Sequence, residues 1–286
     1  MKGFLKYVEI TTKITSFFPF IMIIVYLLKS GFEIDITKTA VFFLSMLLFD
    51  LCTTAINNYT DKKELTVSKR IALFTIIVLL FSSTALGIWL VFLTDISVLI
   101  LGIICFFCGF IYNCGPIPLS ALPLGELFSG LCYGFFIPLI LMYINVPSGF
   151  LYSFKVGSEI ILTVNTLELL KLILICIAPI FATAGIMLAN NICDVEYDIK
   201  IGRYTLAYYL KNKALILFKL LYFIIFISFI ILIFLKKSFI FSLLFFIPVY
   251  KNIKTFEEKQ IKEETFITSV KNYILVMVAE ILCLAL

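Results

Sequence analysis

The stretch ALILFKLLYFIIFISFIILIFL, residues 214–235, decides the fold class, because it is apolar along almost its whole length. A transmembrane α-helix needs about 20 predominantly apolar residues to cross the hydrocarbon core of a bilayer. A strand of a transmembrane β-barrel would instead alternate apolar and polar residues over about 10 positions. The stretch therefore predicts a membrane-spanning helix and argues against a barrel.

The rest of the chain has the same character. Of its 286 residues, 62% are hydrophobic and 14% are charged, and the mean hydropathy is +1.13, whereas soluble domains average about 25% charged residues. We expect an all-α, polytopic bundle of about nine transmembrane helices in a single domain, 1–286. The predicted spans are 14–29, 38–58, 71–93, 96–113, 118–144, 168–191, 214–235, 238–250 and 267–286.

Basic residues predict the orientation of these spans, since short cytoplasmic loops carry an excess of Lys and Arg. With the N-terminus in the cytoplasm, most of the basic residues outside the spans fall on the cytoplasmic side. No small-residue cleavage site follows the first apolar run, so we expect a retained helix and no signal peptide. The sequence thus predicts a multi-pass protein of the cell membrane, surrounded by the lipid bilayer. No nucleic-acid partner is expected, and the oligomeric state is left open.

A short polar sequence occurs twice, as NNYTD at residues 57–61 and as NNICD at residues 190–194. Each copy lies at the C-terminal end of an apolar run and is followed by basic residues. Polar and ionisable residues are costly in a membrane, so their presence indicates a function. The copies divide the domain into two motif-bearing halves, about 1–115 and 116–286, and suggest one site built from both.

Helical spacing supports a shared site. Asn57 and Asp61 are four residues apart and share a helix face, and Asn190, Asp194 and Asp198 repeat that spacing. The two helices are four spans apart in the predicted topology, so they run in the same direction and end on the cytoplasmic side. Oxygen ligands from both helices should therefore point into one cavity.

The absence of histidine narrows the chemistry. It excludes His-based acid–base catalysis and His metal ligands, and oxygen ligands favour Mg²⁺ over Zn²⁺. Carboxylates on both sides of a diphosphate would repel it unless divalent cations bridge them. We therefore expect a Mg²⁺ site with the ligands Asp61, Asn57, Asp194 and Asp198. Basic residues after each copy, including Lys63, Lys200 and Arg203, would offset the remaining phosphate charge.

These motifs match a known family. NNYTD resembles the first Asp-rich motif, N-D-x-x-D, of the UbiA-type intramembrane prenyltransferases, and NNICDVEYD resembles the second. The continuation IKIGRYTLAYYL is similar to the run that follows that second motif. YNCGPIPLSALPLGEL, residues 112–127, resembles the Gly-Pro/Gly-Glu segment of the 1,4-dihydroxy-2-naphthoate prenyltransferase branch. VEITTKITSFFPF, residues 8–20, is similar to the N-terminal helix of that branch, where a basic residue, here Lys13, faces the site.

The resemblance covers nearly the whole chain, with two departures in the first motif. Asn58 stands where the family usually has Asp, and Glu64 only approximates its third acidic position. These departures reduce the carboxylates that the first helix can offer to a metal. The second motif, with Asp194 and Asp198, is therefore expected to hold the better-ordered metal.

The resemblance implies a reaction. It predicts Mg²⁺-dependent transfer of a polyprenyl group from a polyprenyl diphosphate to an aromatic acceptor, first of all 1,4-dihydroxy-2-naphthoate in menaquinone or demethylmenaquinone biosynthesis. Another aromatic acceptor, such as 4-hydroxybenzoate, is the alternative within the same class. From another class, an ion-coupled secondary transporter would use intramembrane acids such as Asp50, Glu126 and Asp194 as an ion path.

The residues and the resemblance together predict the roles of individual residues. The catalytic set is Asp61, Asp194, Asp198 and Glu126. The substrate-binding set is Lys13, Asn57, Asn58, Tyr59, Lys63, Tyr112, Asn190, Asn191, Lys200 and Arg203. Glu126, an acid inside a span, would orient or deprotonate the acceptor hydroxyl or else pair with another helix. Tyr59, Tyr112 and Tyr133 are the aromatic candidates for stabilising an allyl cation through cation–π contact.

Overall fold

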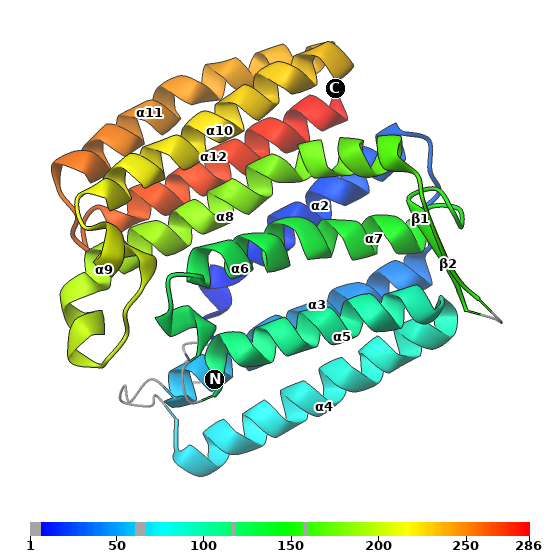
Figure 1. The fold of residues 1–286 in the computed structure, drawn as a ribbon, viewed down its shortest axis with the longest axis horizontal. Helices are drawn as coiled ribbons and strands as arrows, with labels where there is room; N and C mark the ends of the chain where they lie inside the picture. Colours follow the sequence, from blue (N-terminus) through cyan, green and yellow to red (C-terminus); the bar gives the residue numbers. More distant parts are fainter. Residues whose placement is uncertain (1–6, 61–66, 116–117, 157–158) are drawn as a thin grey trace.

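The computed structural model describes residues 7–60, 67–115, 118–156 and 159–286. Long helices lie side by side and fill the molecule, as Figure 1 shows. Their bounds are α2 Ile14–Lys29, α3 Ile36–Thr60, α4 Lys69–Leu93, α5 Ile96–Asn113, α6 Gly125–Leu131, α7 Ile137–Asn145, α8 Thr166–Lys200, α9 Leu206–Leu210, α10 Lys213–Leu235, α11 Leu243–Glu258 and α12 Phe266–Ala285. The predicted all-α class is confirmed.

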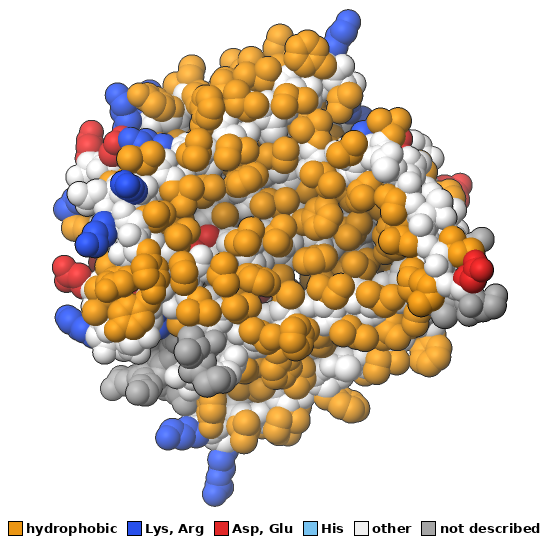
Figure 2. All heavy atoms as spheres, in the orientation of Figure 1, with side chains coloured by type: hydrophobic (Ala, Val, Ile, Leu, Met, Phe, Trp, Pro, Cys, Tyr) orange, Lys and Arg blue, Asp and Glu red, His pale blue; other side chains and the backbone are white. Residues whose placement is uncertain are grey.

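The helices have the length and composition of membrane spans. Among the described residues, eight helical segments are long and apolar enough to cross a membrane, and α2, with 16 residues, is shorter. Figure 2 shows hydrophobic side chains over the middle of the visible face, with charged side chains gathered mainly at the end where α3 and α8 finish. Large apolar side chains such as Phe92 and Phe234 are among the most exposed. The chain is a multi-pass membrane protein, and the count of nine spans stays a prediction.

The fifth predicted span, 118–144, begins too early. Residues Leu119–Ala121 form a 3₁₀ turn (η2), and α6 begins only at Gly125. Pro118 and Pro123 lack a backbone N–H and disfavour helical geometry in the preceding residue, which explains the late start. A π-helical segment, Cys132–Phe136 (η3), then joins α6 to α7. Such π-turns interrupt α-helices frequently at functional sites.

Helix α8 is longer than the predicted span 168–191. It has 35 residues, which corresponds to about 50 Å, against a hydrocarbon core of about 30 Å. Its C-terminal turns therefore extend beyond the hydrocarbon, and the whole second motif is helical. The helix ends at Lys200, and Gly202, two residues later, has a φ of +78°, which suits glycine just after a helix terminus.

A small antiparallel hairpin is an element that the sequence did not predict. Strands β1 (Tyr152–Val156) and β2 (Ile160–Val164) pair between α7 and α8, with Tyr152 opposite Val164. The hairpin lies at the end of the bundle opposite the C-terminal ends of α3 and α8 (Figure 1). The ring of Tyr152 stacks on that of Tyr143 in α7, with centroids 4.7 Å apart.

Two glycines allow α6 and η3 to approach α8 closely. A Cβ added at Gly134 would lie 2.3 Å from the backbone nitrogen of Ile180, and one at Gly130 would lie 2.7 Å from its carbonyl oxygen. The neighbouring atoms are backbone, so they cannot move aside as a flexible side chain would. The contact fixes η3 against the middle of α8, near Pro179.

This close approach leads to a stability prediction. We expect Gly134→Ala to lower the melting temperature of the purified protein, because an added methyl in a tightly packed contact costs about 1–3 kcal/mol. The matched control is Gly102→Ala in α5, where an added Cβ meets nothing within 4 Å. Equal melting temperatures for the two variants in detergent would contradict the close contact.

Candidate active site

A cavity of about 1220 Å³ opens between the helices. Its walls come from α2, α3, α4, α5, α6 with η3, α7, α8 and α12. Where α3, α5 and α8 end, the lining is polar, with residues such as Asn57, Asn113 and Asp194. Towards the opposite end it becomes apolar, with residues such as Phe42 and Val98. The cavity thus suits a molecule with a charged head and a long apolar tail.

Both copies of the repeated motif line this cavity. Asn57 comes from α3, whereas Asn190, Asp194 and Asp198 come from α8 at intervals of one helical turn. Asp198 is buried in the last turns of α8. The structure therefore brings together, around one space, segments more than a hundred residues apart. Asp61 and Lys63, from the first copy and its loop, lie outside the described residues.

The ammonium of Lys262 binds side-chain oxygens of the second copy. The sequence provided no reason to expect this contact. Lys262 Nζ lies 2.6 Å from Asp194 Oδ2 and also donates to Asn190 Oδ1. A carboxylate and an amide oxygen thus converge on one cation. The sequence offered no signal for this contact, because Lys262 looks like any basic residue of a loop and lies 68 positions from Asp194.

Arg203 lies just after the C-terminal end of α8 and binds its last turn. Its backbone N–H donates to Asp198 O at 2.8 Å, and its guanidinium donates to Ser120 O at 3.2 Å. Its Nε is 3.9 Å from Asp198 Oδ1. The side chain lines the cavity, so a positive charge lies next to the second motif, and its role in binding phosphate stays a prediction.

Glu126 and Tyr112 form a buried polar group behind the motif. Asn191 Nδ2 donates to Glu126 Oε1 at 2.8 Å, and Glu126 is only 5% exposed. Within the described part of the chain, Glu126 Oε2 and the Tyr112 hydroxyl have no hydrogen-bond partner. Tyr112 and Asn191 line the cavity but Glu126 does not. Of its two predicted roles, the structure shows the pairing with another helix, through Asn191 of α8.

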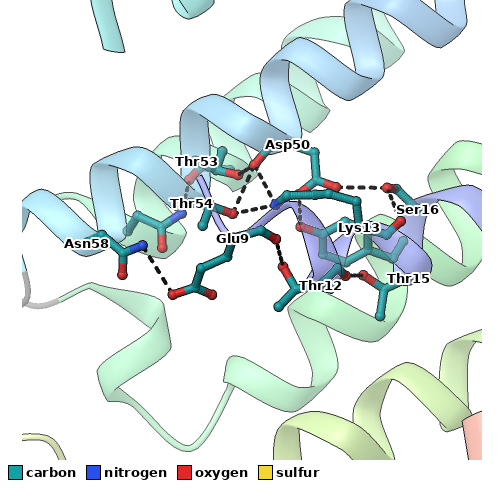
Figure 3. A network of polar contacts seen from close by, with 12 residues as sticks. Glu9, Thr12, Lys13, Thr15, Ser16, Asp50, Thr53, Thr54 and Asn58 are labelled. Carbon is teal, nitrogen blue, oxygen red and sulfur yellow. Dashed lines mark hydrogen bonds and ion pairs between the residues drawn. The ribbon is translucent and has the colours of Figure 1, made fainter. Parts of the chain in front are cut away.

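Lys13 and Asp50 form the centre of a buried network, drawn in Figure 3. Lys13 Nζ lies 2.8 Å from Asp50 Oδ1 and 2.5 Å from Thr54 Oγ1. Ser16 and Tyr133 each donate a hydroxyl to Asp50 at 2.8 Å. The pair is buried and lines the cavity, and its charges are satisfied by hydrogen bonds, which buried ion pairs require. The network joins the N-terminal segment, α3 and η3.

Three predicted substrate-binding residues do not line the cavity, and their role in binding stays a prediction. Asn58 Nδ2 donates to Tyr7 O at 2.8 Å and to Glu9 Oε1 at 3.1 Å, so its amide holds the N-terminal segment (Figure 3). Tyr59 is 40% exposed, one helical step beyond Asn58. Lys200 is exposed and lies two positions after Asp198, which turns it to another side of α8.

The donor set can be compared with the needs of Mg²⁺. Among the residues that the structure describes, no group of three or more His, Cys, Asp or Glu side chains could hold a metal. Mg²⁺ in phosphate sites requires less, since it binds through one or two carboxylates plus substrate phosphates and water. The oxygens of Asp194 and Asn190 already hold a cation, the Lys262 ammonium. The residues therefore fit a metal that is completed by a phosphorylated ligand.

Solved structures share this architecture. A UbiA homolog from Aeropyrum pernix K1 superposes with a TM-score of 0.63 and 18% sequence identity, covering 92% of this chain and 96% of that one. A UbiA homolog from Archaeoglobus fulgidus, in a structure bound to GPP and Mg²⁺, has a TM-score of 0.57 and 15% identity, covering 99% of this chain and 100% of that one. At these identities the similarity establishes the fold.

Sequence comparison adds a curated relative and the family. The 1,4-dihydroxy-2-naphthoate octaprenyltransferase of Bacillus subtilis (strain 168) is 31% identical over 129 residues, which cover 45% of this chain and 35% of that relative. The aligned stretch is therefore about a third of the relative's length. Residues 16–260 match the UbiA prenyltransferase family, and this match includes both motif copies and most of the cavity wall. The chain belongs to the UbiA prenyltransferase family of enzymes.

Proposed function

We propose that this prenyltransferase transfers a polyprenyl group from a polyprenyl diphosphate to an aromatic acceptor, in a Mg²⁺-dependent reaction. The observation that carries the proposal is the single cavity, polar where both motif copies meet and apolar beyond. A polyprenyl diphosphate has the matching shape, with a charged head and a hydrocarbon tail. The Archaeoglobus fulgidus homolog, whose structure holds GPP and Mg²⁺, supports the same class of donor.

The residues at the polar end have distinct tasks in this proposal. Asp194, Asp198, Asn57 and Asn190 would hold Mg²⁺, which neutralises the diphosphate and stabilises charge on the leaving group. Arg203, held by Ser120 O and next to Asp198, supplies a preorganised positive charge for the same oxygens. Preorganised charges of this kind are commonly the largest contribution to catalysis.

The reaction is balanced by the two substrates alone. The allylic C–O bond of the donor breaks, and its electron pair leaves with the diphosphate. Tyr112 and Tyr133 line the cavity, where aromatic rings stabilise an allyl cation. An electron-rich carbon of the acceptor forms the new C–C bond, and the ring regains aromaticity by losing a proton or, from a carboxylated carbon, carbon dioxide. Glu126 acts through Asn191 and is a positioning residue.

We propose 1,4-dihydroxy-2-naphthoate as the acceptor, which would place the enzyme in menaquinone or demethylmenaquinone biosynthesis. The support is the segment 112–127, which resembles that branch, and the partial similarity to the Bacillus subtilis enzyme. The alternative is another phenolic acceptor such as 4-hydroxybenzoate. The apolar wall of the cavity leaves the prenyl chain length open.

The proposal predicts both product and metal dependence. Purified protein in detergent, given Mg²⁺, a polyprenyl diphosphate and a panel of aromatic acceptors, should yield a prenylated naphthoquinol precursor detectable by mass spectrometry. Chelation of the metal with EDTA should abolish product, because the diphosphate charge is then not neutralised, and added Mg²⁺ should restore it. Absence of both product and pyrophosphate release with every acceptor would contradict the enzymatic proposal and favour the ion-coupled transporter.

We also propose that the motif-bearing end faces the cytoplasm and that the protein resides in the cell membrane. The support is the distribution of basic residues in the loops at that end, since cytoplasmic loops retain Lys and Arg. Reporter fusions after residues 64 and 262 should report a cytoplasmic location, and a fusion after residue 158 the opposite side.

A further inference from the structure

Lys262 is a cation from another loop that contacts the second motif. It lies in the turn between α11 and α12, and its ammonium binds Asp194 Oδ2 at 2.6 Å together with Asn190 Oδ1. It also lines the cavity. Its side chain is 34% exposed and that of Asp194 is 29% exposed, so the pair faces the cavity and remains open to exchange.

The turn that carries Lys262 is well fixed. Ile261 N–H donates to Thr265 Oγ1 at 2.9 Å, and Ile261 O accepts from the N–H groups of Thr265 and Phe266 at 2.9 and 3.2 Å. The Lys262 ammonium also lies 4.8 Å from the centre of the Phe266 ring, a favourable cation–π distance. The fold therefore fixes the backbone of Lys262 next to the motif. The flexible side chain still allows the ammonium to move.

The ammonium and a divalent metal compete for the same oxygens. Asp194 and Asn190 are proposed metal ligands, and two cations on one carboxylate repel each other. Metal binding therefore requires Lys262 to leave Asp194. A diphosphate bound beside the metal gives the displaced ammonium a new acceptor, because Lys is an effective point charge for phosphate.

We propose that Lys262 is a placeholder cation: it neutralises the second motif before the metal arrives and then transfers to the diphosphate. This inference rests on the proposed function, since it assumes that metal and diphosphate bind at this motif. The transfer of Lys262 couples the binding of the metal to the binding of the diphosphate. The metal binds tightly only when the diphosphate accepts the ammonium that leaves Asp194. By linkage, the lysine raises the affinity for diphosphate once the metal is present.

The test measures binding without turnover, using Mn²⁺ and inorganic pyrophosphate with the full-length protein in detergent. Without pyrophosphate, Lys262→Met should bind Mn²⁺ about fivefold more tightly than the wild type, the upper range for removing a partly exposed ion pair. On the Mn²⁺-loaded protein, Lys262→Met should bind pyrophosphate about fivefold more weakly. Lys262→Gln should change both affinities in the same direction.

The matched control is Lys259→Met. Lys259 lies in the same connection and pairs with Glu264 at 2.6 Å, away from the motif, so both affinities should equal those of the wild type. Unchanged or weaker Mn²⁺ binding in Lys262→Met, or unchanged pyrophosphate binding, would overturn the inference. Prenyl transfer by the wild type would stand in either case, whereas its absence alongside the expected binding shifts would overturn only the proposed function.

Discussion

Replacing Asp194 by alanine is expected to lower prenyl transfer by about 10³-fold, comparable to the loss of one preorganised electrostatic group in an active site. Asp194 lines the cavity on α8 and provides a carboxylate at the point where a cation is already held. Without this carboxylate, Asp198 and Arg203 would remain at the site, but the site would lose an oxygen that is proposed to bind the metal. Initial rates of product formation at saturating Mg²⁺ and donor would measure the effect.

Glu196 offers a matched control for this substitution. It lies on the same helix two residues later, is exposed and does not line the cavity. Glu196→Ala should therefore keep the wild-type rate, and both variants should express and purify like the wild type. Asp61→Ala, at the corresponding position of the first motif, is expected to lose activity as well. Near-normal turnover in Asp194→Ala would show that the metal site is misassigned.

Replacing Asp50 by alanine should give the largest loss of stability. Lys13 would remain buried without its counter-ion, and Ser16 and Tyr133 would lose their acceptor. Removing one partner of a buried ion pair costs about 3–5 kcal/mol. The melting temperature in detergent, followed by loss of monodisperse protein on heating, measures this effect.

A double variant separates stability from activity at this network. Lys13→Met with Asp50→Leu removes both charges, and apolar replacements of a buried pair are often neutral or stabilising. We expect the melting temperature to recover while prenyl transfer stays low, because Lys13 lines the cavity. Asp35→Ala serves as the control, since its pair with Lys38 is partly exposed, with side chains 39% and 31% exposed, and contributes about 1 kcal/mol or less. A double variant as unstable as Asp50→Ala would contradict the ion-pair explanation.

The sequence predicted the spans well wherever hydropathy alone determines a helix. The apolar run 214–235 corresponds closely to α10 (Lys213–Leu235), and the repeated motif correctly predicted that Asn57 and Asp194 share one cavity. Spacing along a helix carries this information, because residues four apart lie on one face. Hydropathy was less informative at the polar ends of the helices. It predicted that the sixth span ends near residue 191, although α8 continues to Lys200.

The rest depended on tertiary contacts that no local pattern encodes. Lys262 looked like a topological charge, and only the fold shows that it reaches Asp194. Asp50 was recognised as an intramembrane acid, but its partner Lys13 lies 37 positions away and could not be identified by spacing. Asn58 was predicted at the substrate, whereas its amide binds the N-terminal segment. Such side chains have the same local signature whether they bind a ligand or another loop.

The cavity wall has a consequence for how the protein is made. The wall runs from Glu9 in the N-terminal segment to Ile274 in α12, and Tyr273 of α12 donates to Thr15 O at 3.2 Å across 258 positions. During synthesis the early helices enter the bilayer without α12 and without Lys262, so the reaction chamber stays open on that side. We therefore expect catalytic competence only after α12 has joined the bundle. In the proposed reaction, the allylic cation would then form only in a chamber that α12 closes against lipid and water.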